Sequence, residues 1–138
     1  MAFPGWFSSL DAIRNFYAKA AEQAGLDKKA ITDIELAVDE AATNIINHAY
    51  GGEGKGEIEC CYRVIPEGLE IILHDHGNPF NPEAVRQPDL ISDVCCREPG
   101  GLGLHIMKSL MDSVDFSFNG HGGNLLTMTK LHKKALGS

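Results

Sequence analysis

The chain has 138 residues, enough for one domain with a hydrophobic core and too few for two ordinary ones. Twelve Lys and Arg against nineteen Asp and Glu leave a net charge of −7, which disfavours nucleic acid and anionic membrane surfaces as partners. No positively charged segment precedes an apolar stretch at the N-terminus, and no apolar run approaches the roughly 20 residues that span a bilayer. We therefore expect a soluble, cytoplasmic protein.

Two amphipathic helices are predicted at the start of the chain. Apolar residues recur every three or four positions from Leu10 up to Gly25, and Ser8-Ser9-Leu10-Asp11 has the Ser-x-x-Asp form of a helix cap. The same spacing returns after Asp27, which can cap a second helix that ends at Tyr50 and the glycines behind it.

The rest of the chain predicts strands, a third helix and one long loop. We expect a strand at 58–64 and its hairpin partner at 69–73. A helix at 104–111 and two further strands at 114–118 and 124–131 follow. The stretch 81–99 carries three prolines and little periodicity. So long a loop in a small domain is usually functional, so we expect a mobile lid there rather than a connector.

The four cysteines form two adjacent pairs, Cys60-Cys61 and Cys95-Cys96. Zinc sites and thioredoxin-like sites usually separate their sulfurs by two residues, which argues against a metal site. Neighbours on a strand point to opposite faces, so we expect Cys60 and Cys61 to be reduced packing residues. For the second pair, which falls in the loop, packing and a redox role both stay open.

The second predicted helix carries a carboxylate and an amide on one face. Glu40 and Asn44 are four residues apart, His48 follows one turn later, and the small Ala37 and Ala41 leave room beside them. An amide oxygen is a suitable ligand for Mg²⁺, and a carboxylate can take a proton from a hydroxyl nucleophile. The pair suits phosphoryl transfer, although solvated polar residues on an exposed helix face give the same pattern.

A second motif, Asp75-His76-Gly77-Asn78-Pro79-Phe80, follows the hairpin. Asp75 can accept a hydrogen bond from an exocyclic amine such as adenine N6, and Gly77 lets a ring approach the backbone. A simple turn is the alternative, because Asp, Gly, Asn and Pro all form turns. On an extended strand His74 and His76 both face away from Asp75, so a His-Asp-His metal cluster is not expected.

The third motif, Gly100-Gly101-Leu102-Gly103, stands directly before the third predicted helix. Unhindered backbone amides at a positive helix end can receive phosphates. The motif is neither a Walker A loop, since no Gly-Lys-Ser/Thr follows, nor a dinucleotide fingerprint, since no strand directly precedes it. Together and in this order, the three motifs predict a Mg²⁺-dependent ATP site.

With these motifs the chain resembles the GHKL ATPases, and within them the small bacterial anti-sigma-factor serine kinases. Glu40-x-x-x-Asn44 with His48 resembles the N box of that family. Asp75-x-Gly77-x-Pro79-Phe80 resembles its G1 box, and Gly101-Leu102-Gly103-Leu104 its G2 box. The similarity covers residues 10–132.

The resemblance implies a fold as well as a site. The expected class is α/β, or α+β, in two layers: a mixed, mainly antiparallel sheet with helices on one face, known as the Bergerat fold. It also implies a single ATP-binding domain over 1–138, with its core at 8–132 and the lid at 81–99.

Roles follow from the resemblance by position. Glu40 becomes the general base, Asn44 the Mg²⁺ ligand and Asp75 the adenine anchor. Thr127 or Thr129, on the last strand, adds a polar contact near the base. The implied ATP-binding residues are Asn44, His48, Asp75, Gly77, Pro79, Phe80, Arg97, Gly100, Gly101, Leu102, Gly103, Leu104 and Thr127.

One stretch departs from the family pattern. Related kinases often place an Arg about two residues before the G2 glycines to meet the terminal phosphate, whereas Glu98-Pro99 stands here. Such a charge supplies much of the stabilisation of a transferring phosphoryl group. Arg97, Lys55 or a cation from a partner are the three candidates for that role.

The implied function is an ATP- and Mg²⁺-dependent serine/threonine kinase that acts as an anti-sigma factor. It phosphorylates an antagonist, or anti-anti-sigma, protein of the STAS type, binds a sigma factor and forms a homodimer. The alternative is a nucleotide-gated binding module that sequesters its partner without appreciable turnover. A histidine-kinase fragment is not expected, since the stretch before Glu40 is too short for a phosphoacceptor helical hairpin.

Overall fold

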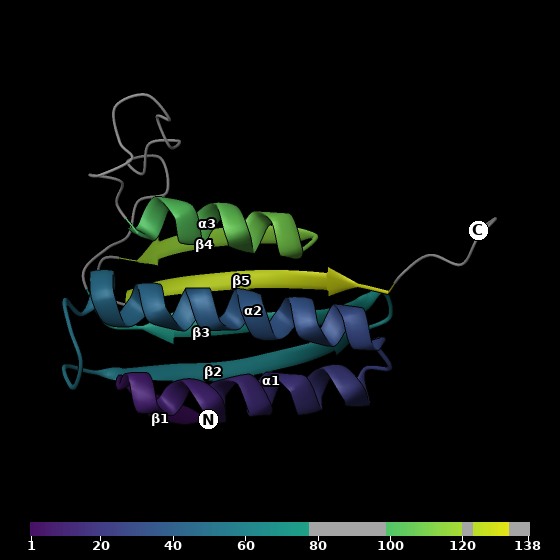
Figure 1. Cartoon of the computed structure of the whole chain (residues 1–138), viewed down its shortest axis with the longest axis horizontal. Coiled ribbons are helices and arrows are strands. Elements are labelled where there is room, and N and C mark those ends of the chain that lie inside the picture. The colour runs from purple at the N-terminus through teal and green to yellow at the C-terminus, as the bar shows by residue number, and fades with distance from the viewer. Residues whose placement is uncertain (78–98, 120–122, 133–138) are drawn as a thin grey trace.

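A five-stranded sheet with helices on one face makes up the described chain (Figure 1). The computed structural model describes residues 1–77, 99–119 and 123–132. Its elements in chain order are β1 (Ala2–Pro4), a 3₁₀ turn η1 (Phe7–Ser9), α1 (Leu10–Gln23), α2 (Lys28–Asn44), a π-helical turn η2 (Ile45–Ala49), β2 (Glu57–Ile65), β3 (Gly68–Asp75), α3 (Pro99–Leu110), β4 (Ser113–Asn119) and β5 (Gly123–Leu131).

The strands lie in the order β1-β2-β3-β5-β4, and each neighbouring pair is antiparallel. This confirms the two-layer sandwich with helices on one face, and every pairing among the described strands is antiparallel. The β2–β3 hairpin was expected. The short edge strand β1 was not, because three residues are too few to show a period of two.

Helices α1 and α2 begin in different ways. The Asp27 carboxylate accepts a hydrogen bond from the Ala30 backbone N–H (2.8 Å), as expected of a cap. The cap predicted at Ser8-Ser9 is wrong, since Ser9 makes no side-chain cap bond and its own backbone is helical. The turn η1 leads directly into α1 and supplies its first backbone bonds instead.

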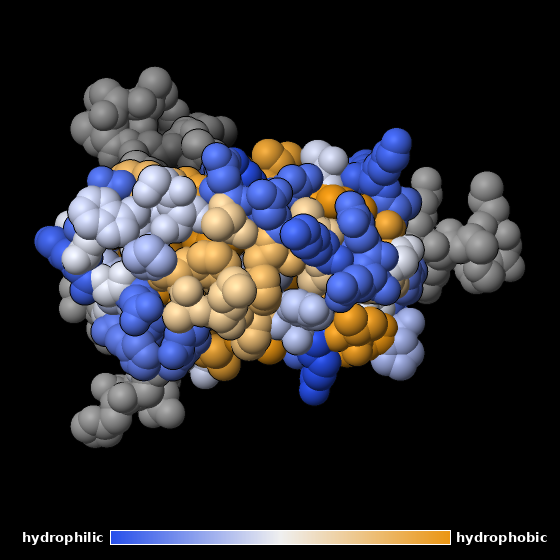
Figure 2. Space-filling view, turned by 90° about the horizontal axis from the view of Figure 1, so that it is seen from below, coloured by the Kyte–Doolittle hydropathy of each residue, from blue (hydrophilic) through white to orange (hydrophobic). Residues whose placement is uncertain are grey.

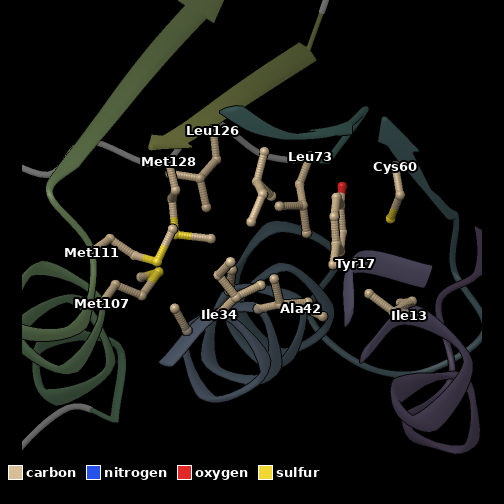
Figure 3. Close-up of a cluster of buried hydrophobic side chains, with 14 of the residues drawn as sticks. Ile13, Tyr17, Ile34, Ala42, Cys60, Leu73, Met107, Met111, Leu126 and Met128 are labelled. Carbon is tan, nitrogen blue, oxygen red and sulfur yellow. The ribbon is translucent and has the colours of Figure 1, made fainter. Parts of the chain in front are cut away.

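The core lies between the helices and the sheet (Figure 3). From α1, Ile13 and Tyr17 are fully buried, and the Tyr17 hydroxyl donates to the Ile72 carbonyl (2.6 Å). Cys60 is buried among these side chains, whereas Cys61 is exposed on the opposite face, so the expectation of a packing role is right for Cys60 and wrong for Cys61. Burial raises the pKa of the Cys60 thiol to about 11, so it stays protonated and unreactive at neutral pH.

Some expectations fall where no structure is described. Cys95 and Cys96 lie outside the described residues, and so does the predicted lid except for Pro99, which begins α3. Among the helices that are described, none is both long and apolar enough to cross a bilayer.

Candidate nucleotide-binding site

A small pocket opens between the end of α2 and the sheet. Its helical wall comes from α2, η2 and α3, with Asn44, His48 and Met107 among the lining residues. Its sheet wall comes from the end of β3 at Asp75 and the start of β5 at Asn124. A largely apolar cleft with a few converging polar groups is the usual form of a small-molecule site.

Asp75 is the buried acid of this pocket, with 3% of its surface exposed. Its Oδ1 atom accepts hydrogen bonds from the Gly77 backbone N–H (2.9 Å) and from Asn124 Nδ2 (2.8 Å). Burial raises the pKa of this carboxyl, while the two hydrogen bonds work in the opposite direction. The carboxylate is therefore held in one orientation at the pocket wall.

Asn124 is the site residue to which sequence reasoning gave no role. It is buried and lies directly opposite Asp75 in the pairing of β3 with β5. Gly123 makes that pairing possible, since it has a φ of +83° and a Cβ there would lie 2.1 Å from the Asp75 carbonyl oxygen. Only the strand register brings the two side chains together, and one strand read alone does not show its register.

Gly77 packs against the end of the helical segment. A Cβ at this position would lie 2.4 Å from the carbonyl oxygen of Ala49, the last residue of η2. Next to it, the Tyr50 hydroxyl accepts from the His76 backbone N–H (3.0 Å) and donates to the Glu57 carbonyl (2.6 Å). The glycine thus lets the end of β3 meet the helix end that forms the pocket wall.

Asn44 is the last residue of α2, and the environment of its side-chain amide is unusual. Its Nδ2 atom is buried and has no hydrogen-bond partner among the described residues. A buried amide without a partner costs free energy, so its position calls for an explanation such as a bound ligand. The π-helical turn that begins after Asn44 is of a type often found at functional sites.

His48 and Glu40 flank Asn44 along the helical segment. His48 is exposed and lines the pocket from η2. Glu40 is partly buried one turn before Asn44 and lies outside the set of residues that line the pocket. The three side chains follow one another along the segment as the sequence predicts.

The glycine motif lies inside a helix rather than before it. Helix α3 begins at Pro99, so Gly100, Gly101, Leu102 and Gly103 form its first turn. Proline is favoured at the first helical position because its ring presets φ and the missing N–H is unpaired there in any case. Leu104 follows as a buried core residue.

The candidate cations and the remaining motif residues divide into two groups. Pro79, Phe80, Arg97 and Glu98 lie outside the described residues. Lys55 is exposed, donates to the Gly51 carbonyl (3.2 Å) and does not line the pocket.

The structure does not bring Thr127 to the pocket. On β5, Asn124, Leu126 and Met128 are the buried side chains that face the helices. Because successive side chains alternate, Thr127 and Thr129 lie on the opposite face of the sheet. The polar side chain that this strand does bring to the pocket is Asn124, three residues earlier, which donates to Asp75.

Comparisons with known proteins agree with this arrangement. Residues 4–130 match the model of the histidine kinase-like ATPase domain family. The chain is 37% identical to serine-protein kinase RsbW of Listeria monocytogenes over 114 residues, which is 80% of this chain and 71% of that one. It is 33% identical to serine-protein kinase RsbW of Bacillus subtilis over 135 residues, covering 94% and 82% of the two chains.

Solved structures show the same fold at lower identity. The RsbU and RsbW domains of Rv1364c from Mycobacterium tuberculosis match 98% of this chain with a TM-score of 0.62 and 16% identity. The histidine kinase domain of the Erythrobacter litoralis EL346 blue-light activated kinase matches 72% with a TM-score of 0.51 and 20% identity. This chain spans 33% and 43% of those two solved chains. By sequence match and fold, the chain belongs to the histidine kinase-like ATPase family, in which its curated relatives are serine-protein kinases.

Proposed function

We propose that this chain is an ATP-dependent serine/threonine protein kinase that acts as an anti-sigma factor in a partner-switching system. Its substrate is a serine or threonine of an antagonist protein of the STAS type, and its second partner is a sigma factor. The observation that carries this proposal is the Asp75–Asn124 pair in a pocket beside Asn44, in a chain 33% to 37% identical to serine-protein kinases. Both partners imply a cytoplasmic location.

The base of ATP is assigned to the part of the pocket that Asp75 lines. Asp75 Oδ1 is used by Gly77 and Asn124, and neither of these bonds uses Oδ2. We assign this second oxygen to the exocyclic amine of adenine, which is a donor. Apolar side chains suited to the faces of a flat ring line the same pocket: Ile45, Ala49, Met107 and Leu126.

The phosphates are assigned to the space between Asn44 and the first turn of α3. The first N–H groups of a helix have no partner within it and carry the positive end of its dipole, and here this turn is 100–103. The Asn44 side chain has a buried Nδ2 atom with no partner among the described residues, so its NH₂ group is not committed to internal bonding. It fits a role in which its oxygen holds Mg²⁺ and its nitrogen donates to a phosphate oxygen.

Glu40 is assigned as the general base. It lies one helical turn from Asn44 and is partly buried, close to the expected phosphates but outside the adenine pocket. The hydroxyl oxygen of the substrate serine attacks the γ-phosphorus, its proton passes to the Glu40 carboxylate, and ADP leaves. Bound Mg²⁺ would neutralise charge on the phosphate oxygens during this transfer.

The test separates binding from transfer with one substitution. Glu40→Gln keeps the shape of the side chain and removes its ability to take a proton. We expect phosphate transfer from γ-labelled ATP to an antagonist domain to fall by about 100-fold or more, while the Kd for ATP changes by less than about threefold. Glu22→Gln, on the exposed surface of α1, is the matched control and should leave both quantities unchanged.

Two results would contradict the proposal. Full transfer by Glu40→Gln would remove the general base from the mechanism. ATP binding without any labelled antagonist from the wild-type protein would favour a nucleotide-gated binding module over a kinase.

Homodimer formation is part of the proposal, and an apolar surface supports it. The face on which α1 and β1 lie shows hydrophobic side chains at its centre (Figure 2). Met1, Trp6 and Phe7 are exposed near the N-terminus, whereas Tyr17 of α1 is fully buried in the core and cannot contribute to such a surface. Sedimentation of the wild-type protein and of a Phe7→Ser variant tests the assignment, and a monomeric wild type would overturn it.

A further inference from the structure

Two histidines and one glutamate converge on the face of the sheet opposite the helices. Asp75 points toward the helices, so its neighbours His74 and His76 lie on the other face, as expected from an extended strand. Glu59, on β2, is the direct cross-strand partner of His74. The described helices all lie on the first face, so these three side chains meet away from the nucleotide pocket (Figure 1).

The ligand atoms of the three residues form a compact set. Glu59 Oε2 lies 2.5 Å from His74 Nδ1 and 3.7 Å from His76 Nε2. One ligand atom from each residue lies within 4.8 Å of the others, and the imidazole centroids are 4.6 Å apart. Glu59 and His74 line a hollow of this face together with Met1 and Cys61, and His76 is itself exposed, so solvent reaches all three side chains.

We propose that Glu59, His74 and His76 form a binding site for a transition-metal ion, with Zn²⁺ as the probe. Two imidazoles and one carboxylate are a common ligand set for such ions, and a water can complete the tetrahedron. Ligand atoms about 2.0–2.1 Å from a tetrahedral Zn²⁺ lie about 3.3 Å apart. The two distances from Glu59 Oε2 to the imidazole nitrogens, 2.5 and 3.7 Å, lie on either side of this value.

The side chains can reach that geometry with little rearrangement. Glu59 is 52% exposed, so its carboxylate is free to turn and lengthen its contact with His74. The His76 N–H donates to the Tyr50 hydroxyl, and this hydrogen bond holds the His76 backbone in place. Only the His76 side chain therefore has to move. The strand pairing fixes the backbones of Glu59 and His74 in the same way.

The chemistry of the set separates it from the Mg²⁺ proposed at Asn44. Mg²⁺ prefers oxygen ligands and keeps most of its waters, whereas imidazole favours Zn²⁺, Ni²⁺ and Cu²⁺. The two sites lie on opposite faces of the sheet and share no residue. Metal binding at the histidines can therefore be measured without ATP and without kinase activity.

The experiment titrates tag-free protein with Zn²⁺ by calorimetry and with Co²⁺ by visible absorption. We expect one equivalent to bind, with the absorption of a tetrahedral Co²⁺ ion held by nitrogen and oxygen. Glu59→Gln and His76→Asn should each weaken binding by about tenfold or more. His132→Asn, which removes an exposed histidine from the end of β5, is the matched control and should bind as the wild type does.

Three results would overturn the proposal. The first is no binding of either ion to wild-type protein whose circular dichroism shows it folded. The second is equal affinity in the wild type and both cluster variants. The third is a sulfur-to-cobalt charge-transfer band or displacement of Zn²⁺ by excess Mg²⁺, which would assign the metal to a cysteine or to an oxygen site.

Discussion

Replacing Asp75 by Asn should separate ATP binding from stability. One oxygen of Asp75 already accepts from two donors, Gly77 N–H and Asn124 Nδ2. An amide has a single oxygen, so if that oxygen keeps both bonds, its NH₂ group faces the exocyclic amine of adenine. The variant thus exchanges a hydrogen bond to a charged acceptor for two donors that face each other. This costs about 3 kcal/mol of ATP-binding free energy, or about 100-fold in Kd.

The stability of the same variant should change little. Burial raises the pKa of Asp75 in the folded protein, so at neutral pH its ionised form destabilises the fold relative to a neutral side chain. We expect the free energy of unfolding of Asp75→Asn to be no more than about 1 kcal/mol below that of the wild type. Calorimetric titration with ATP and urea denaturation measure the two quantities.

Asp33→Asn is the control that should give the reverse result. Asp33 lies away from the pocket and accepts hydrogen bonds from Lys130 Nζ (3.0 Å) and Lys29 Nζ (3.2 Å). Losing its charge leaves the largely buried Lys130 without a counter-ion, so unfolding should become easier by about 1–3 kcal/mol while the Kd for ATP stays unchanged. An unchanged Kd in Asp75→Asn would refute the reasoning about the adenine anchor.

Three further predictions follow from the same contacts. Gly77→Ala places a methyl group against the Ala49 carbonyl, so thermal denaturation should show a loss of about 1–3 kcal/mol and titration a weaker Kd for ATP; a neutral effect would contradict the close packing. Thr127→Val should leave the Kd for ATP within about twofold of the wild type, because the residue faces away from the pocket, and a larger change would place it in the site. Burial by itself raises the pKa of the Asp33 carboxyl. The hydrogen bonds that this carboxylate accepts from Lys130 and Lys29 outweigh burial, so its pKa lies below the ordinary value. The stabilisation it provides is thus complete above about pH 4 and disappears as the pH falls through the lowered pKa, so the stability difference between wild type and Asp33→Asn should shrink in acid; a constant difference from pH 5 to pH 3 would contradict this.

Local pattern predicted much of the fold. The periods of 3.6 and 2 located α1, α2 and the β2–β3 hairpin, because each buries one stripe or one face against the core. Alternation likewise put Cys60 and Cys61 on opposite faces, but only Cys60 is a packing residue, because the face that carries Cys61 is not covered by the described helices (Figure 1). The cap at Asp27 was predictable since it depends only on the next three residues, whereas the cap at Ser9 failed because the preceding turn makes its backbone helical.

The parts of the site that were missed depend on strand pairing. Glu40, Asn44 and Asp75 could be proposed from the sequence because each lies within a short motif. Asn124 acquires its role only from its register opposite Asp75, and Glu59 becomes relevant only as the cross-strand neighbour of His74. Register over such sequence distances is set by the whole sheet, so one strand examined alone does not reveal it.

The most direct measurement of the central claim is a crystal structure with Mg²⁺ and a non-hydrolysable ATP analogue. The account predicts the exocyclic amine of adenine within hydrogen-bond distance of Asp75 Oδ2, with the Asp75–Asn124 bond unchanged. It also predicts Mg²⁺ at about 2.1 Å from the Asn44 oxygen, with the phosphates at the first turn of α3. Adenine bound outside this pocket, or a metal coordinated without Asn44, would contradict it.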